Sequence, residues 1–390
     1  MKNRFSNRLA KLDDYIFSQI RETKGLSSDL EPIDLSLGNP DDPPDREIIR
    51  TLIREAQTLE SHRHPLYRGI PELKEKIAEW FFKRFKVKLN PETEILILAG
   101  SKQGLGLVGL TFLNKGDVAL VPNPAYPVYR RGVLLAEGKP LDMLLLKENR
   151  WLPDLDKLSK KISSKTKIIF INYPNNPTGA VASIGFLKKL VDFAVKNDII
   201  IISDMAYSEI TFDNFKTHSI LEIDEAKQRA LEFFSFSKSF NMTGWRLGFV
   251  VGNKDLINAL QKVRVTLDSG VFHLLQKGGI TALSHSEKTK NICQIYQRRR
   301  DILFKGLKDC GWEVEKPEGA IFIWAKPPWQ YSSNQSMSIL KKKASIITTP
   351  GAGLGSQGEE YIRFSLTAPD EKIKQVVKRL KELPIGGKKR

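Results

Sequence analysis

The sequence predicts an α/β fold with a mostly parallel main sheet, together with a smaller α+β domain. Three observations lead to this prediction: short apolar runs that do not alternate with polar residues, segments of helical spacing between several of them, and a different pattern from about residue 271 onward. Strands that are apolar throughout are typical of parallel sheets covered by helices on both faces. The chain has 390 residues, 41% of them hydrophobic, which is ample for a sizeable core.

The first 45 residues, proline-rich at Pro40, Pro43 and Pro44, indicate an arm that crosses to the rest of the chain. We assign residues 1–45 to this arm and to part of the smaller domain, and residues 46–270 to the large domain. Residues 271–390 form the remainder of the smaller domain.

The large domain takes its predicted strands from five apolar runs, at 95–98, 118–121, 167–171, 199–202 and 247–251. In open α/β sheets, ligands bind at the carboxyl ends of the strands. Ser101, Asn176 and Asp204 follow three of these runs. We therefore expect them to lie close together, at a binding site.

The last part of the chain begins with a long helical stretch from about residue 271 to 300. Short strands then follow near Val314, at 321–324 and at 362–365. Helices followed by a few short strands indicate a smaller α+β domain.

The formal net charge of +17 raises the question of a nucleic-acid partner. The basic residues are scattered, and neither zinc pairs nor an aromatic RNA-binding signature accompanies them, so we expect solvated faces and some attraction for anionic substrates. Neither Cys293 nor Cys310 has a C-x-x-C partner, and we expect no metal site. No run of ~18 apolar residues indicates a membrane span, and a cytoplasmic location is the default expectation.

A lysine, Lys238, stands in the strand-like run 235–238 and is followed by Arg246. Such a lysine can form a Schiff base, and a nearby hydroxyl and arginine can hold a phosphate. Upstream, Asp204 can pair with a pyridinium nitrogen. These are the residue types that pyridoxal phosphate (PLP) chemistry requires, so the sequence predicts an enzyme.

Four motifs in one order, at 175–179, 204–207, 235–238 and 241–246, resemble those of the fold-type I, class I/II aminotransferases. The resemblance covers nearly the whole chain. It implies a large PLP-binding domain with a seven-stranded, mostly parallel sheet, and a homodimer with shared active sites. Amino acids and 2-oxo acids are the substrates that it implies.

By this resemblance, Lys238 holds PLP and moves the proton between the substrate and the cofactor. Asp204 pairs with the pyridine nitrogen, and Tyr207 and Asn176 donate hydrogen bonds to the phenolate oxygen of the ring. A helix cap for Asp204 and an ordinary packed tyrosine for Tyr207 are the structural alternatives.

Phosphate donors are expected from Ser235, from Arg246 and from the start of a helix at Gly100, Ser101 and Lys102. Backbone N–H groups at a helix N-terminus bind anions, and a glycine permits close approach.

Substrate contacts are also implied by the family. Arg363 matches the arginine that binds the α-carboxylate, and the backbone of Gly38 faces the substrate, beside Asn176. Tyr126 matches the aromatic residue that stacks on the cofactor. An arginine facing solvent and a plain turn glycine are the alternatives.

One position departs from the pattern of the family. Where many relatives have a tyrosine that reaches the phosphate of the neighbouring subunit, this chain has His64. Either His64 or Tyr67 is expected to make that contact.

Segments 241–248, 268–272 and 351–355 look like those of the LL-diaminopimelate aminotransferase branch, which exchanges an amino group with 2-oxoglutarate. An aspartate/alanine-type aminotransferase stays open, because Lys102 could bind a side-chain carboxylate. A PLP-dependent β-lyase and a non-enzymatic ligand-binding regulator are the alternatives from other classes.

Overall fold

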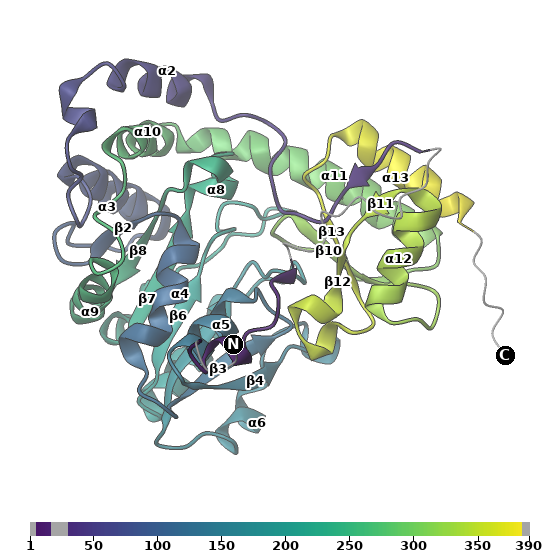
Figure 1. Cartoon of the computed structure of the whole chain (residues 1–390), viewed down its shortest axis with the longest axis horizontal. Coiled ribbons are helices and arrows are strands. Elements are labelled where there is room, and N and C mark those ends of the chain that lie inside the picture. The colour runs from purple at the N-terminus through teal and green to yellow at the C-terminus, as the bar shows by residue number, and fades with distance from the viewer. Residues whose placement is uncertain (1–4, 17–29, 384–390) are drawn as a thin grey trace.

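The computed structural model describes residues 5–16 and 30–383, so residues 1–4 and 17–29 of the predicted arm lie outside the described residues. A seven-stranded sheet dominates the larger part of the molecule (Figure 1). In spatial order its strands are β2 (Ile95–Leu98), β8 (Gly248–Gly252), β7 (Ala230–Ser235), β6 (Ile200–Asp204), β5 (Thr166–Asn172), β3 (Val118–Asn123) and β4 (Lys139–Leu144). Within this sheet, only the pairings made by β8 are antiparallel. The predicted fold class is therefore confirmed.

Successive apolar residues of the strands pack on opposite faces of this sheet. Ile95 and Ile97 belong to one hydrophobic core, whereas Leu96 and Leu98 belong to another. Helices α3 (Pro71–Phe85), α7 (Ile184–Lys196) and α10 (His273–Ser284) contribute to the first core, and α4 (Ser101–Phe112), α5 (Val128–Leu135) and α9 (Lys254–Arg264) to the second. Burial on both faces explains why these strands read as continuous apolar runs.

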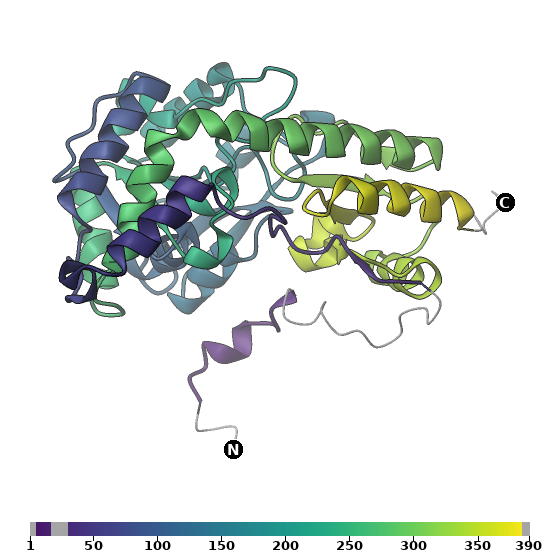
Figure 2. The same cartoon turned by 90° about the horizontal axis from the view of Figure 1, so that it is seen from above.

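The smaller part contains a four-stranded sheet in the order β12 (Thr349–Pro350), β13 (Ile362–Ser365), β10 (Phe322–Lys326) and β9 (Glu313–Val314). A two-stranded parallel sheet pairs β1 (Ile33–Asp34) with β11 (Ile346–Ile347). Its helices are α11 (Thr289–Asp309), α12 (Ser333–Ala344) and α13 (Asp370–Glu382). Figure 2 shows α11 running from the larger part along the smaller one. Further α-helices among the described residues are α2 (Arg46–Glu55), α6 (Leu155–Ser159) and α8 (Phe236–Ser239).

Two local predictions were wrong. The run 235–238 is not a strand, because β7 ends at Ser235 and Lys238 lies on the single turn of α8. The side chain of Ser235 accepts a hydrogen bond from the Ser237 N–H at 3.2 Å, and this N-cap turns the chain out of the sheet. The helical stretch near residues 271–300 is likewise interrupted, since α10 ends at Ser284 and α11 begins at Thr289.

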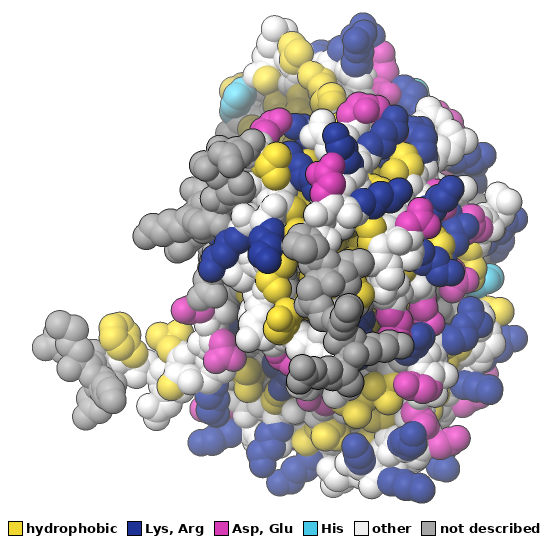
Figure 3. Space-filling model, turned by 90° about the vertical axis from the view of Figure 1, so that its right-hand side faces the viewer, with side chains coloured by type: hydrophobic (Ala, Val, Ile, Leu, Met, Phe, Trp, Pro, Cys, Tyr) yellow, Lys and Arg dark blue, Asp and Glu magenta, His cyan; other side chains and the backbone are white. Residues whose placement is uncertain are grey.

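Basic residues are numerous on one face of the surface (Figure 3). Figure 3 shows Lys and Arg side chains interspersed with acidic ones on the face that it presents. Within residues 5–16 and 30–383, no helix is long and apolar enough to cross a membrane.

Candidate active site

A cavity of about 460 Å³ opens beside the carboxyl ends of the main-sheet strands. Its lining includes eleven of the residues singled out from the sequence: Gly38, Ser101, Lys102, Tyr126, Asn176, Asp204, Tyr207, Ser235, Lys238, Arg246 and Arg363. Gly100, which was also predicted to bind the cofactor, immediately precedes Ser101. Residues separated by more than 300 positions thus meet at one site of the size typical for small-molecule ligands.

Lys238 reaches this cavity from α8, the turn that follows β7. Its amine is partly buried and donates a hydrogen bond to the carbonyl oxygen of Gly38. Burial, with the nearby positive charges of Arg246 and Arg363, lowers the pKa of Lys238 to about 7. A large fraction of the amine is therefore unprotonated, and hence nucleophilic, at neutral pH.

Asp204 is the last residue of β6 and only 4% exposed. Its carboxylate accepts hydrogen bonds from the Tyr129 hydroxyl at 2.7 Å and from the Ala206 N–H at 3.0 Å. Burial raises the pKa of Asp204 to about 6. A buried carboxylate that faces a cavity is a suitable partner for a cationic N–H group, because the two charges then neutralise each other.

Tyrosine rings form two walls of the cavity. Tyr126 and Tyr129 lie around the start of α5, with ring centroids 6.0 Å apart in an edge-to-face arrangement. Tyr207 packs its edge against Phe322 at 5.7 Å. Burial raises the pKa of Tyr126 and Tyr207 above the usual value, so both hydroxyls stay protonated at neutral pH and can donate hydrogen bonds.

An anion-binding cup lies at the start of α4. Gly100 caps this helix with φ = +80°, and a Cβ at this position would lie 2.3 Å from Nη2 of Arg246. Only glycine therefore allows the guanidinium to lie against the helix N-terminus. Nη1 of Arg246 donates to the Thr243 carbonyl at 2.9 Å and lies 3.4 Å from the Ser237 hydroxyl. Backbone N–H groups of a first helical turn, an arginine and hydroxyls are together suited to a phosphate.

Arg363 enters the cavity from β13 of the smaller sheet and is only 1% exposed. Its guanidinium donates to Asn176 Oδ1 at 2.8 Å and to the Ser36 carbonyl at 2.6 Å, and it lies 4.1 Å from the Phe322 ring centroid. Burial lowers the pKa of Arg363 to about 10, so the side chain remains charged at neutral pH. This is a fixed positive charge, oriented by its neighbours, that can bind a carboxylate.

The lining also includes residues that had not been singled out from the sequence, among them Tyr129, Asn172, Phe322 and Tyr15. The sequence positions of two of these residues indicated that they lie near the site. Tyr129 lies three residues after Tyr126, and Asn172 ends β5 at the same sheet edge as Asp204, whose carbonyl its side chain binds at 2.8 Å. Tyr15 gave no signal, because its contact with Lys102 joins two segments far apart in the sequence.

The lining fits PLP by the chemistry of its donor set. The buried carboxylate suits the pyridine nitrogen of that cofactor, and the partly unprotonated amine suits its aldehyde. The tyrosine hydroxyls suit the ring oxygen, and the helix N-terminus with an arginine suits the phosphate. The site residues predicted from the sequence are thus brought together in one place. Their individual roles stay predictions.

His64 and Tyr67 lie outside this cavity. Both are exposed, and their rings contact each other at 5.7 Å. Gly270 lies against their segment, since a Cβ at this glycine would be 2.9 Å from the Leu66 carbonyl. The predicted contact of His64 or Tyr67 with a neighbouring subunit stays a prediction.

Comparison with known proteins identifies the family. The model of aminotransferase class I and II matches residues 31–380. The chain is 44% identical over 380 residues to the LL-diaminopimelate aminotransferase of Dehalococcoides mccartyi (strain CBDB1), covering 97% of this chain and 98% of the relative. Substrate-bound BacF from Bacillus subtilis has a TM-score of 0.93 at 37% identity, over 98% of this chain and 99% of that chain. An aminotransferase from Staphylococcus aureus has a TM-score of 0.92 at 34% identity, over 97% and 98%.

Proposed function

Because the chain belongs to the class I and II aminotransferases, which use PLP, we propose that its amino donor is LL-diaminopimelate and its acceptor 2-oxoglutarate. The donor is inferred from the Dehalococcoides mccartyi relative, whose name states that substrate. The acceptor is the one that the sequence resemblance implies.

One observation carries the chemistry of the proposal: the amine of Lys238 shares a cavity with the carboxylate of Asp204 and the guanidinium of Arg363. PLP, when bound, supplies an electron sink for the negative charge left on the substrate Cα after proton removal. Asp204 would hold the pyridine nitrogen protonated, which that electron sink requires. Ser101, Ser235 and Arg246 would hold the phosphate.

Lys238 would hold the cofactor through its amine and then serve as the base that takes the proton from the substrate Cα. A pKa of about 7 leaves this amine able to accept and return a proton near neutral pH. Arg363 would bind the α-carboxylate and so fix the direction in which the Cα–H bond points. Asn176, which binds Arg363, would orient both the arginine and the ring oxygen of the cofactor.

We further propose a cytoplasmic homodimer. Leu66, Tyr67, Leu267 and Phe272 expose 54%, 50%, 61% and 45% of their surface, and Gly270 brings the two segments that carry them together. An apolar patch of this kind favours burial against a second copy. The two cysteines, Cys293 and Cys310, are not joined in a disulfide, which suits a reducing compartment.

The test is a stopped-flow spectral screen of the PLP-loaded chain against LL-diaminopimelate, glutamate, aspartate, alanine and aromatic amino acids, with detection of the keto acids formed. We expect LL-diaminopimelate and glutamate to convert the cofactor rapidly, and Lys238→Ala to give no conversion. Conversion by aspartate and glutamate alone would instead identify an aspartate-type enzyme. Pyruvate released with ammonia would identify a β-lyase, and binding without conversion would identify a regulator.

A further inference from the structure

The main-chain segment 36–38 connects the two cations of the site. The carbonyl of Ser36 accepts a hydrogen bond from Arg363 Nη2 at 2.6 Å, and the carbonyl of Gly38 accepts one from Lys238 Nζ. Neither carbonyl is free to move without changing the surroundings of a charged group. A shift of this short segment would therefore change the hydrogen bonds of both cations.

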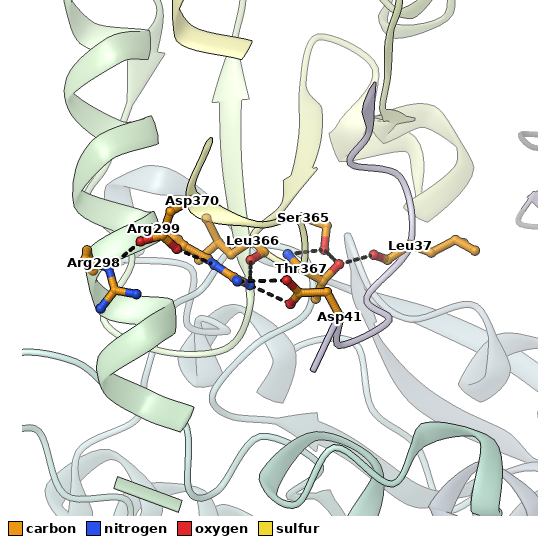
Figure 4. A network of polar contacts seen from close by, with 8 residues as sticks. All are labelled: Leu37, Asp41, Arg298, Arg299, Ser365, Leu366, Thr367 and Asp370. Carbon is orange, nitrogen blue, oxygen red and sulfur yellow. Dashed lines mark hydrogen bonds and ion pairs between the residues drawn. The ribbon is translucent and has the colours of Figure 1, made fainter. Parts of the chain in front are cut away.

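Asp41, three residues farther on, anchors the segment through an ion pair shown in Figure 4. Its two carboxylate oxygens accept from Nη1 and Nη2 of Arg299 at 2.7 and 2.8 Å. The side chain of Arg299, on α11, is 5% exposed, and that of Asp41 is 21% exposed. A bidentate pair with so little solvent contact has a defined geometry, which a surface ion pair does not.

The same guanidinium also holds the chain that follows Arg363. Arg299 Nε donates to Asp370 at 2.9 Å, and its Nη1 lies 3.2 Å from the Leu366 carbonyl. Asp370 is the first residue of α13, and Leu366 directly follows β13. Arg299 therefore joins the end of segment 36–41 to the end of the strand that carries Arg363.

A second link runs parallel to this one. The Thr367 hydroxyl donates to the Leu37 carbonyl at 2.9 Å and lies 2.8 Å from the Ser365 hydroxyl (Figure 4). Segment 36–41 is thus held against the strand of Arg363 both in its middle and at its end.

From this geometry we propose that Arg299 is a positioning residue of the active site. Acting through Asp41, it holds the carbonyls of Ser36 and Gly38 where they orient Arg363 and Lys238. The inference rests on the proposed roles of these two cations in substrate and cofactor binding. It adds that the orientation of both depends on a side chain outside the cavity lining.

The chain supplies a matched control in Arg298. This neighbour on α11 also pairs with Asp370 and is more exposed, with 56% of its side chain accessible. Among the described residues Arg298 pairs with Asp370 alone, whereas Arg299 additionally binds Asp41. Comparing Arg299→Met with Arg298→Met therefore separates the link to segment 36–41 from general support of α13.

The first readout is the half-reaction of the PLP-loaded chain with L-glutamate, measured by stopped-flow absorbance. Glutamate is a substrate under each aminotransferase assignment considered above, so a wrong donor does not affect this test. We expect Arg299→Met and Asp41→Asn each to raise the glutamate concentration for half-saturation by about tenfold, with less change in the limiting rate. Arg298→Met should stay within about twofold of wild type.

The second readout is the capture of PLP by the apo chain as a function of pH, which requires no amino acid. A carbonyl acceptor favours the protonated amine, so displacing the Gly38 carbonyl should lower the pKa of Lys238. In Arg299→Met and Asp41→Asn the midpoint of capture should therefore move to lower pH, by roughly half a unit. The midpoint of Arg298→Met should not move. If Arg299→Met fails to fold, Asp41→Asn, which leaves Arg299 paired with Asp370, provides the same test.

A double-variant cycle determines whether the effect passes through Asp41. If it does, Arg299→Met combined with Asp41→Asn should be no worse than the more impaired single variant. Multiplying effects, or equal impairment in Arg298→Met and Arg299→Met, would overturn the proposal. Wild-type behaviour of Asp41→Asn in both readouts would overturn it as well.

Discussion

Two cations face the same cavity, one from the helical turn after β7 and the other from β13 of the smaller sheet, and their surroundings differ. Lys238 lies at the carboxyl edge of the seven-stranded sheet, where its amine donates to one backbone carbonyl and two arginines are near. Arg363 lies within the four-stranded sheet, where its guanidinium is bound by an amide, a carbonyl and a hydroxyl and lies over the Phe322 ring. Burial lowers the pKa of both, to about 7 for the lysine and about 10 for the arginine.

The difference shows how removal from water can give two cations different chemical functions. Removal from water disfavours either charge, but an amine starts from a lower pKa than a guanidinium and here has fewer acceptors. Lys238 therefore titrates at neutral pH, whereas Arg363 remains a permanent cation. A reactive group on α8 and a fixed anion receptor on β13 can thus share one cavity.

The strongest way to break the comparison is to make the first cation resemble the second. In Lys238→Arg the positive charge remains, but the group no longer loses its proton at neutral pH and cannot hold PLP covalently. We expect turnover to fall by about 10⁴-fold or more, and the absorbance band of PLP bound covalently to the lysine to be absent. Lys238→Ala is the control that removes the charge as well. Measurable turnover in either variant at a tenth of the wild-type rate would contradict the role of Lys238.

The reverse exchange, Arg363→Lys, replaces a planar fork by a point charge in a buried site. The variant cannot bind a carboxylate with two parallel hydrogen bonds, and the burial that acts on Lys238 will lower the pKa of the new amine. We expect kcat/KM to fall by about 10²- to 10³-fold, mainly through KM, while the PLP absorbance band is retained. An unchanged KM would mean that the α-carboxylate binds elsewhere.

The sequence predicts which side chains meet at the sheet edge, but not the local structure that carries Lys238. Apolar runs identify buried strands, and the ends of such strands lie at one edge of the sheet, so the sequence alone is enough to place Asp204 and Asn176 together. The one-turn helix under Lys238 could not be distinguished from a strand, because four residues are too few to show a periodicity.

Two strands of the main sheet also escaped the sequence pattern, for identifiable reasons. β4 is an edge strand with Pro140 and Asp142, so it lacks the apolar run of a central strand. β7 contains Glu232, which is fully buried but interrupts the apolar run. The pairing of Asp41 with Arg299 spans 258 positions, and no local pattern predicts such a contact.

Asp204 extends the comparison to an anion at the same sheet edge as Lys238. Its pKa is about 6 in the folded chain against 3.8 in the unfolded chain, so the unfolded chain releases its proton first as pH rises. The free energy of unfolding of the apo chain therefore falls as the pH rises from about 4 to about 6. At pH 8 the total loss is about 3 kcal/mol. We expect Asp204→Asn to recover much of this free energy of unfolding, measured with urea, at pH 8 and less of it at pH 5. The same variant should lower turnover by about 10²-fold.

Glu232→Gln is the matched control for that variant. Burial raises the pKa of Glu232 to about 7, and its carboxylate binds Ser203 and Ser219 away from the cavity. This substitution should also stabilise the apo chain at pH 8, yet leave turnover near the wild-type value. Equal losses of turnover in the two variants would show that the effect of Asp204→Asn is structural and not due to cofactor binding.

The smallest expected effect tests the titration of Lys238 itself. Only the unprotonated amine can capture PLP, and with a pKa of about 7 its fraction rises roughly tenfold between pH 6 and pH 8. The rate of PLP capture by the apo chain, followed by absorbance, should rise by this factor and level off above pH 8. Arg246→Gln removes one of the charges that lower this pKa, so its rate at saturating PLP should level off at higher pH. A wild-type rate that still rises tenfold per unit between pH 8 and pH 9 would show that Lys238 keeps an ordinary pKa, and the contrast between the two cations would then lie in geometry alone.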